Sequence, residues 1–439
     1  MGMNDLVIIS VDDHITEPGN MFDQHLSGEA YASAPKLKET ADGTNYWEYQ
    51  GMKIPSVGLN AVVGRPKEEY GMEPTSFDQL RKGCYDVHAR VEDMNINGVA
   101  ASLNFASYPM IDGGLFTMAP DKAQSLTHLQ GYNDWHVDEW CGAYPGRFIP
   151  CGLLPVWDME ATAAEIRRLA DKGCHAVSVN ENPTQRGLPS IHNEYWEPFF
   201  KAASDCGTTI CLHIGGGNAS PHATMETPIE AWITTMPMAV AIGAADWLNL
   251  QAFNRYPNLR IALSESGIGW IPYLMERADF SHMQHRAWTN SDTIFGDRKP
   301  SEVFRKHFTS CFIDDAFGLQ NLAAIGEDNV SYECDYPHSD TLWPYVPERL
   351  WETIQHLTPG QIEKITHLNA MRDFQFDMFN ILPREQLTVG ALRAKAAEQN
   401  VDISVKSSGG AAPVAAGTAR RPITSGDIVG MFQKHAEAA

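Results

Sequence analysis

Two residues that can bind a metal ion follow a short apolar stretch near the start of the chain. The stretch 6–11 is apolar and rich in β-branched residues, which predicts a buried strand. Asp12 and His14 are two residues apart, so on a continuing strand their side chains point to one side and that of Asp13 to the other. Charged groups there need a partner. The pair predicts either two ligands of one metal ion or a hydrogen-bonded Asp–His pair in a turn.

Further acidic and imidazole side chains stand at the ends of other predicted strands. These residues are Glu181, His213, Glu265 and Asp335. The alternation along a strand groups them with apolar neighbours: Glu181 with Val177 and Val179, His213 with Cys211, and Glu265 with Ile261 and Leu263. We expect this shared face to line the interior of a barrel, with the polar residues at its mouth. Because so many potential ligands would converge there, the metal interpretation is favoured.

The two histidines and four carboxylates indicate which metal would bind. Imidazole and carboxylate ligands without thiolate suit Zn, Mn or Fe. One site would be filled by four residues: Asp12, His14, His213 and Asp335. If Glu181 and Glu265 also bind metal, a second ion about 3.5–4 Å from the first is expected. Otherwise, Glu265 is a candidate general base or a group that orients water, and Asp335 could transfer protons.

Two neighbouring polar residues are candidates for substrate binding. His338 follows Asp335 by three residues, and Asn180 directly precedes Glu181. His338 would either contact substrate or support a metal ligand. Turn structure explains Asn180 equally well.

The elements that must position these residues alternate between strands and helices. Eight strand-like runs occur, at 6–11, 99–107, 148–156, 175–182, 208–216, 259–267, 308–315 and 330–337. Amphipathic helical stretches separate them, which predicts an α/β fold with a parallel sheet, and eight strands are the number that closes a (β/α)8 TIM barrel. A doubly wound open sheet is the alternative, but no G-x-G-x-x-G follows the first strand.

Two regions fall outside this alternation. We expect the barrel over residues 1–385, with an inserted cap region at 19–80 that covers the active site. We expect a helical extension at 386–406, a flexible linker at 407–423 and a tethered amphipathic helix at 424–439. This last helix could pack on its own barrel, on a neighbouring subunit or on nothing stable, and we expect a homo- or hetero-oligomer formed through barrel faces and this helix.

Composition narrows the class of protein. The chain has 439 residues and a net charge of −22, which opposes binding to nucleic acid. The eight cysteines include no C-x-x-C and favour reduced thiols of a cytoplasmic protein. We expect no signal peptide and no membrane association.

At the residues described above, the sequence resembles the amidohydrolase superfamily, in the amidohydrolase-2 branch that contains aminocarboxymuconate-semialdehyde decarboxylase and related aromatic-acid decarboxylases. The resemblance covers about residues 5–382. Five motifs carry it: "SVDDHITEP", "HAVSVNENP", "CLHIGGG", "ALSESGIGWIPYLMERAD" and "CDYPHSD". It implies a distorted (β/α)8 barrel whose metal is held by Asp12, His14, His213 and Asp335. The decarboxylases carry a catalytic histidine after strand six, where this sequence has Glu265.

Three hypotheses of function follow. The first is a metal-dependent hydrolase or non-oxidative decarboxylase acting on a small organic acid or amide, with one or two divalent ions. The second is a non-haem dinuclear Fe or Fe/Mn oxygenase, because some amidohydrolase-like barrels with carboxylate-rich sites resemble such enzymes. The third is a partner subunit of a hetero-oligomeric enzyme with a structural metal.

Overall fold

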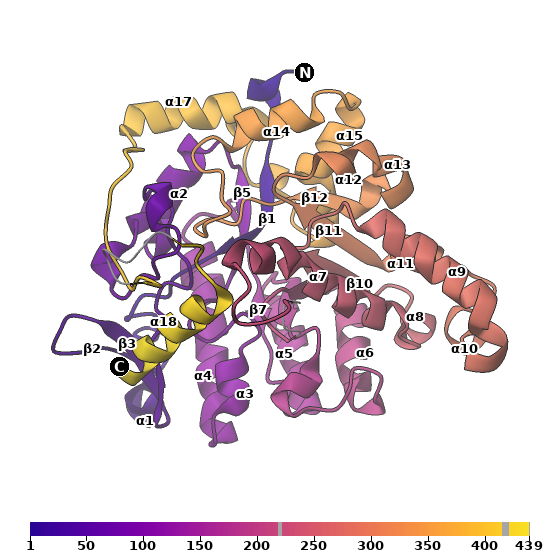
Figure 1. Ribbon diagram of the computed structural model, residues 1–439, viewed down its shortest axis with the longest axis horizontal. Helices are drawn as coiled ribbons and strands as arrows, with labels where there is room; N and C mark the ends of the chain where they lie inside the picture. The colour runs from indigo at the N-terminus through magenta and orange to yellow at the C-terminus, as the bar shows by residue number, and fades with distance from the viewer. Residues whose placement is uncertain (218–221, 415–420, 439) are drawn as a thin grey trace.

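Parallel strands and helices alternate along the chain in the computed structural model, which describes residues 1–217, 222–414 and 421–438. Figure 1 shows the strands at the centre and most helices around them. The parallel strands are β1 (Ile9–His14), β5 (Ala101–Phe105), β6 (Phe148–Ile149), β7 (Gly152–Leu153), β8 (Ala176–Val179), β9 (Thr209–His213), β10 (Arg260–Ser264), β11 (Phe308–Phe312) and β12 (Val330–Tyr332). All eight predicted runs overlap a strand, although β1 begins and ends three residues later than the predicted run 6–11.

The strands close into a barrel. One sheet has the order β1-β5-β6 and the other the order β12-β11-β10-β9-β8-β7. β6 and β7 belong to one run that breaks at Pro150, a residue with no backbone N–H to donate. At the other seam, Asp335 N–H donates to Asp12 O (2.9 Å) and His14 N–H donates to Tyr336 O (2.7 Å). The first and last strands therefore meet, as in a barrel and not in an open sheet.

Helices follow the strands and cover the outside of the barrel. The larger ones are α2 (Val87–Ile96), α4 (Lys122–Asp134), α5 (Met159–Asp171), α6 (Glu197–Cys206), α7 (Ile229–Leu248), α9 (Ile271–Thr289), α11 (Pro300–His307) and α14 (Val346–Ile354). Shorter helices are α3 (Gly114–Met118), α8 (Ala252–Arg255), α10 (Asp292–Phe295), α12 (Ala316–Gln320), α13 (Leu322–Ile325), α15 (Pro359–Glu363) and α16 (Asn369–Asp373). Within the described ranges, no helix is both long and apolar enough to cross a membrane.

The register between β8 and β9 corrects the expected direction of the side chains. Cys211 pairs with Ser178, whereas Val177 pairs with Ile210. Val177 packs in the larger apolar core with the helices, and Cys211 belongs to the core inside the barrel. The prediction that Val177 and Val179 line the interior is therefore wrong, because sheet and helix layers bury both faces of such strands and the sequence pattern cannot distinguish them.

A similar correction applies to β10, where Ile261 pairs with Ile210 and packs in the same outer core. The inward positions of β10 are Ala262 and Ser264, and Ser264 pairs with His213. The expectation that Glu265 reaches the site along the face of Ile261 and Leu263 is therefore wrong.

A bulge in β1 directs the first two predicted ligands. Ser10 pairs with Ser102 but Asp13 pairs with Asn104, so β1 has one residue more than β5 between these pairs. Bulges re-aim side chains and are frequent beside active sites. Asp13 turns away from the site, as predicted, and accepts hydrogen bonds from the hydroxyls of Ser10 (2.9 Å) and Ser102.

The region after β1 forms a small antiparallel sheet. Helix α1 (Gly28–Ser33) precedes strands β2 (Lys36–Glu39), β3 (Asn45–Tyr49) and β4 (Met52–Ile54). Trp47 is fully buried and stacks on Tyr108, with ring centroids 4.1 Å apart. Tyr49 hydrogen-bonds through its hydroxyl to His128 Nδ1 (2.9 Å) on α4. These contacts attach the small sheet to the barrel.

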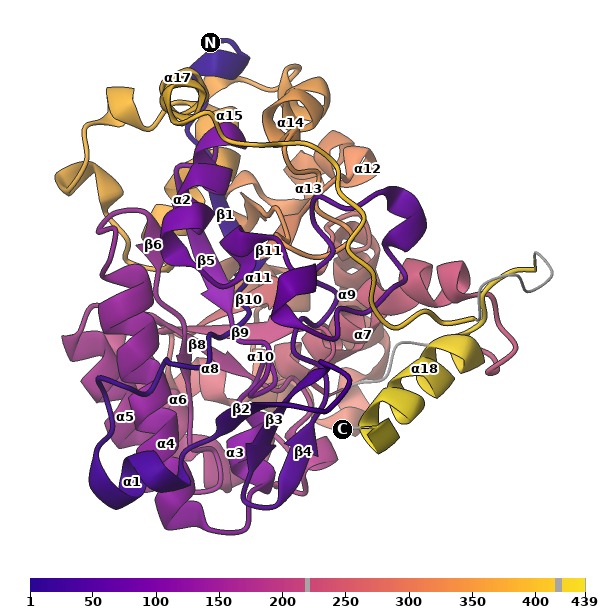
Figure 2. The same ribbon diagram turned by 90° about the vertical axis from the view of Figure 1, so that its left-hand side faces the viewer.

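The C-terminal part crosses the molecule after the barrel. Helix α17 (Val389–Gln399) packs against α2, and α18 (Ser425–Ala438) contacts α7. Figure 2 shows the chain running from α17 past the region after β1 to α18. Of the predicted linker 407–423, residues 415–420 lie outside the described residues.

Candidate metal centre

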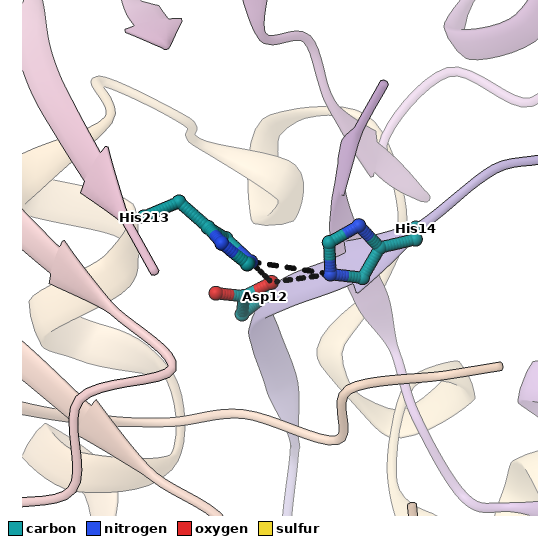
Figure 3. A group of neighbouring side chains, drawn as sticks. All are labelled: Asp12, His14 and His213. Atoms are coloured by element: carbon teal, nitrogen blue, oxygen red, sulfur yellow. Dashed lines mark hydrogen bonds and ion pairs between the residues drawn. The ribbon is translucent and has the colours of Figure 1, made fainter. Parts of the chain in front are cut away.

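Three predicted ligands meet at the carboxyl ends of β1 and β9 (Figure 3). Asp12 Oδ1 lies 3.4 Å from His14 Nε2 and 3.3 Å from His213 Nε2. The two Nε2 atoms are 3.2 Å apart. All three residues are buried, and one potential ligand atom from each lies within 4.8 Å of the others.

The polar atoms of this cluster fit a divalent cation. His213 Nδ1 hydrogen-bonds to Ile214 O (2.7 Å), which fixes a tautomer whose Nε2 carries a lone pair toward the cluster. Within the described residues, both carboxylate oxygens of Asp12 and of Asp335 are buried without a hydrogen-bond donor of good geometry. Buried carboxylates of this kind need a counter-charge. Imidazole nitrogens with carboxylate oxygens suit Mn, Zn or Fe.

Asp335 joins the cluster from the loop after β12. Its Oδ1 lies 3.4 Å from His14 Nε2 and 2.8 Å from His338 Nδ1. Asp335 has a left-handed backbone, with φ of 50°. The His338 ring stacks on that of His14 at a centroid distance of 3.9 Å. Its Nε2 has no hydrogen-bond partner in the part of the chain that the structure describes. His338 thus contacts two candidate ligands.

Glu265 reaches the cluster by a route that strand alternation does not predict. It follows the last residue of β10 and has a φ of 52°. The left-handed backbone breaks the alternation and directs the carboxylate inward, with Oε2 at 3.5 Å from His213 Nε2. Such a conformation is uncommon for a residue other than glycine, and strained residues of this kind are enriched at active sites.

Two further residues beside Asp12, Glu333 and Cys311, were not predicted from the sequence. Glu333 and Cys311 form a buried group with Asp12, in which potential ligand atoms lie within 4.8 Å of one another. Glu333 Oε2 accepts hydrogen bonds from Cys311 Sγ (2.6 Å) and from Glu265 N–H (3.1 Å). A signal existed, because Glu333 precedes Asp335 by two residues at the end of the same strand.

Burial and charge separate the carboxyl groups into two kinds. Burial alone would raise the pKa of Asp12, but the neighbouring His213 and His14 bring it below the ordinary value. Burial alone would likewise raise the pKa of Asp335, but the neighbouring His338 and His14 outweigh burial and lower it. In contrast, burial and the charges of Asp335 and Asp12 raise the pKa of Glu265 well above its ordinary value. The surroundings of the site thus shift the pKa values of its carboxyl groups in opposite directions.

Two other candidates lie near the site without joining the cluster. Glu181 is buried after β8, and its carbonyl accepts a hydrogen bond from Trp247 Nε1 (2.8 Å). The potential metal-binding groups found among the described residues do not include it. Asn180 donates hydrogen bonds from Nδ2 to Asp112 Oδ2 (3.0 Å) and to Gly216 O. Metal binding by Glu181 and substrate binding by Asn180 remain predictions.

A cleft of about 590 Å³ leads to the site. Glu265 and Glu333 lie on its lining together with Trp270 and Phe312. Lys67 and Tyr70, from the region after β1, line it as well. The cleft can therefore admit a small molecule with an apolar body to the buried carboxylates.

Comparisons with known proteins give the class of this barrel. A family model described as amidohydrolase matches residues 88–376, more than half of the chain. The chain therefore belongs to the amidohydrolase family, in the branch that its decarboxylase relatives represent.

Among these relatives are two curated decarboxylases and one solved structure. The chain is 23% identical over 308 residues to 2-amino-3-carboxymuconate-6-semialdehyde decarboxylase of Dictyostelium discoideum, covering 69% of this chain and 80% of the relative. It is 24% identical over 337 residues to gamma-resorcylate decarboxylase of a Rhizobium species, covering 72% and 96%. The structure of 5-carboxyvanillate decarboxylase from Novosphingobium aromaticivorans, complexed with manganese, matches with a TM-score of 0.59 at 18% identity, covering 85% and 98%.

Proposed function

We propose that this chain is a metal-dependent, non-oxidative decarboxylase of a small organic acid. One observation carries the proposal: within the described part of the chain, a buried cluster of two histidines and two carboxylates has carboxylate oxygens without hydrogen-bond partners, next to Glu265, whose pKa is raised by burial and by neighbouring carboxylates. The relatives named above are decarboxylases, and one is complexed with manganese. Asp12, His14, His213 and Asp335 would hold the ion.

A divalent ion held by these residues would supply a positive charge that attracts an acidic substrate and stabilises negative charge formed during the reaction. When the bond between the ring or chain carbon and the carboxylate breaks, CO₂ leaves and the electron pair stays on carbon. That carbon must then receive a proton. Glu265 is suited to donate it, because it lies in the cleft beside His213 and its pKa is raised.

His338 and Glu333 would support this chemistry from either side. His338 contacts Asp335 through Nδ1 and stacks on His14, so it fixes the positions of two ligands. Glu333 accepts a hydrogen bond from the backbone N–H of Glu265 and so helps to hold its left-handed conformation. Apolar residues of the cleft, such as Phe312 and Trp270, would exclude water from the reacting carbon.

The test is a direct assay of CO₂ release. The protein is loaded with Mn²⁺ or Zn²⁺ and given a panel of hydroxybenzoic, dicarboxylic and unsaturated acids, with the corresponding amides as a second panel. Release of CO₂ without O₂ uptake supports the proposal. Hydrolysis of amides alone would show instead that the same site activates water.

A second candidate is a dinuclear oxygenase, and the additional carboxylates favour it. Glu265 Oε2 lies 3.5 Å from His213 Nε2, and Glu333 forms a group of potential ligands with Asp12 and Cys311. Carboxylate-rich sites suit Fe or Mn. About two Fe or Mn ions per chain together with O₂ consumption would support this function. About one ion per chain and CO₂ release would exclude it.

A further inference from the structure

The C-terminal segment attaches to the loop that carries Lys67 and Tyr70. Lys406 N–H donates to Gly64 O (2.9 Å), before these two residues. After them, Glu73 and Ala411 exchange two backbone hydrogen bonds (2.8 and 3.0 Å). The loop is thus bound on both sides of the two positions that face the cleft.

Glu69, between Lys67 and Tyr70, makes a third attachment. Its carboxylate accepts hydrogen bonds from Ser408 N–H (3.2 Å) and from the Ser407 hydroxyl. Because these bonds occupy Glu69, its carboxylate is directed toward the tail and not toward Lys67. Lys67 lines the cleft together with acidic residues such as Glu265 and Glu333.

The same segment attaches further along to the chain that leads into α7. Ser425 N–H donates to Thr227 O (2.9 Å) and Gly426 N–H donates to Met225 O (2.8 Å). In return, Ile229 N–H, at the start of α7, donates to Ile423 O (2.8 Å). Helix α18 then contacts α7 and buries Met431.

Helix α7 forms another wall of the same cleft. Ile233, Met236 and Met238 line it, and they follow within three turns of the attached residues. Figure 2 shows the tail passing over the region after β1 before it reaches α18. The C-terminal segment therefore bonds to both parts of the chain that wall the cleft on its outer side.

We infer that the C-terminal segment is a positioning element for substrate binding: it holds the loop of Lys67 and Tyr70 and the start of α7 in the places that shape the cleft. The inference rests on the cleft of the proposed function. The rigidity of the two cleft walls can nevertheless be measured whatever reaction takes place there. Loops with few buried contacts open locally at low free energy, and backbone attachments raise that free energy.

Hydrogen exchange of the full-length, manganese-treated protein tests this inference. Met431→Asp places a charge at the buried position of α18, and Phe432→Asp is its matched control because Phe432 is 37% exposed. Ala411→Pro removes the donor to Glu73 O, and Ala412→Pro is its control because no hydrogen bond of Ala412 is seen in the described part of the chain. We expect exchange about tenfold faster over residues 225–238 in Met431→Asp and over residues 62–73 in Ala411→Pro.

The controls should match the wild type, and exchange in β9 and β10 should not change in any variant. Bound manganese should also be retained. If a substrate is found, KM should rise severalfold in both test variants at nearly constant kcat. Unchanged exchange in both walls would overturn the inference, and so would faster exchange throughout the barrel strands, which would show a general loss of stability. Failure to detect decarboxylation would count against the proposed function alone.

Discussion

At the scale of single residues, the proposed function depends on carboxyl groups with different proton affinities in one buried site. Asp12 and Asp335 lie beside histidines and have lowered pKa values, whereas Glu265 has a raised one. Metal binding needs the first kind, and proton donation needs the second. Glu265 stands after strand six, where the decarboxylases that the sequence resembles carry a catalytic histidine. In the proposed function, a carboxylic acid would therefore donate the proton in place of an imidazole.

Replacement of Glu265 by glutamine should separate catalysis from metal binding. Glu265→Gln keeps the size of the side chain but removes its acidic proton. We expect kcat for CO₂ release to fall by about 100-fold or more, with bound metal close to the wild-type amount. Steady-state kinetics with elemental analysis of the same samples checks this, and Asp340→Asn, a change at another carboxylate of the cleft, serves as the comparison. Equal activity of Glu265→Gln and wild type would remove Glu265 from the proton step.

At the scale of elements, the sequence predicts which segments form strands but not how their ends turn. Every predicted run overlaps a strand, since buried parallel strands read as apolar runs between helices. The bulge in β1 and the left-handed residues Glu265 and Asp335 are invisible to such patterns. Glu333 was missed although it lies within the predicted run 330–337. In the structure, the strand there has only three residues, Val330–Tyr332, and Glu333 follows it.

The small sheet after β1 should depend on one buried side chain. Trp47 is fully buried against Tyr108, whereas its neighbour Tyr46 is partly exposed. Trp47→Ala should lower the free energy of unfolding by about 3–5 kcal/mol, because a large apolar side chain leaves a cavity. Tyr46→Ala should lower it by about 1 kcal/mol or less. Urea denaturation followed by circular dichroism measures both, and similar losses for the two variants would contradict this packing.

At the scale of the whole molecule, buried neutral histidines link stability to pH. Burial lowers the pKa of His136 from its usual 6.5 to about 4. The unfolded chain therefore binds a proton below about pH 6.5 that the folded protein does not bind until about pH 4. The stabilisation is complete above the first value and is lost as the pH falls toward the second.

This linkage predicts a pH-dependent difference between wild type and His136→Gln. From pH 7 to pH 5, the free energy of unfolding of the wild type should fall by about 2 kcal/mol more than that of the variant. Urea denaturation at the two pH values provides the measurement, and only the change in the difference matters, since the substitution has its own constant cost. A difference independent of pH would show that His136 titrates normally in the folded protein.

The barrel brings together residues that are far apart in the chain. The proposed function rests on the claim that four of them, Asp12, His14, His213 and Asp335, bind metal. Elemental analysis of protein purified in the presence of Mn²⁺ tests it most directly, with His213→Ala as the test variant and His175→Ala, a partly exposed histidine outside the cluster, as control. We expect about one bound ion or more per chain in the wild type and the control, and almost none in folded His213→Ala. Absence of metal from the wild type, or its full retention in His213→Ala, would contradict the account.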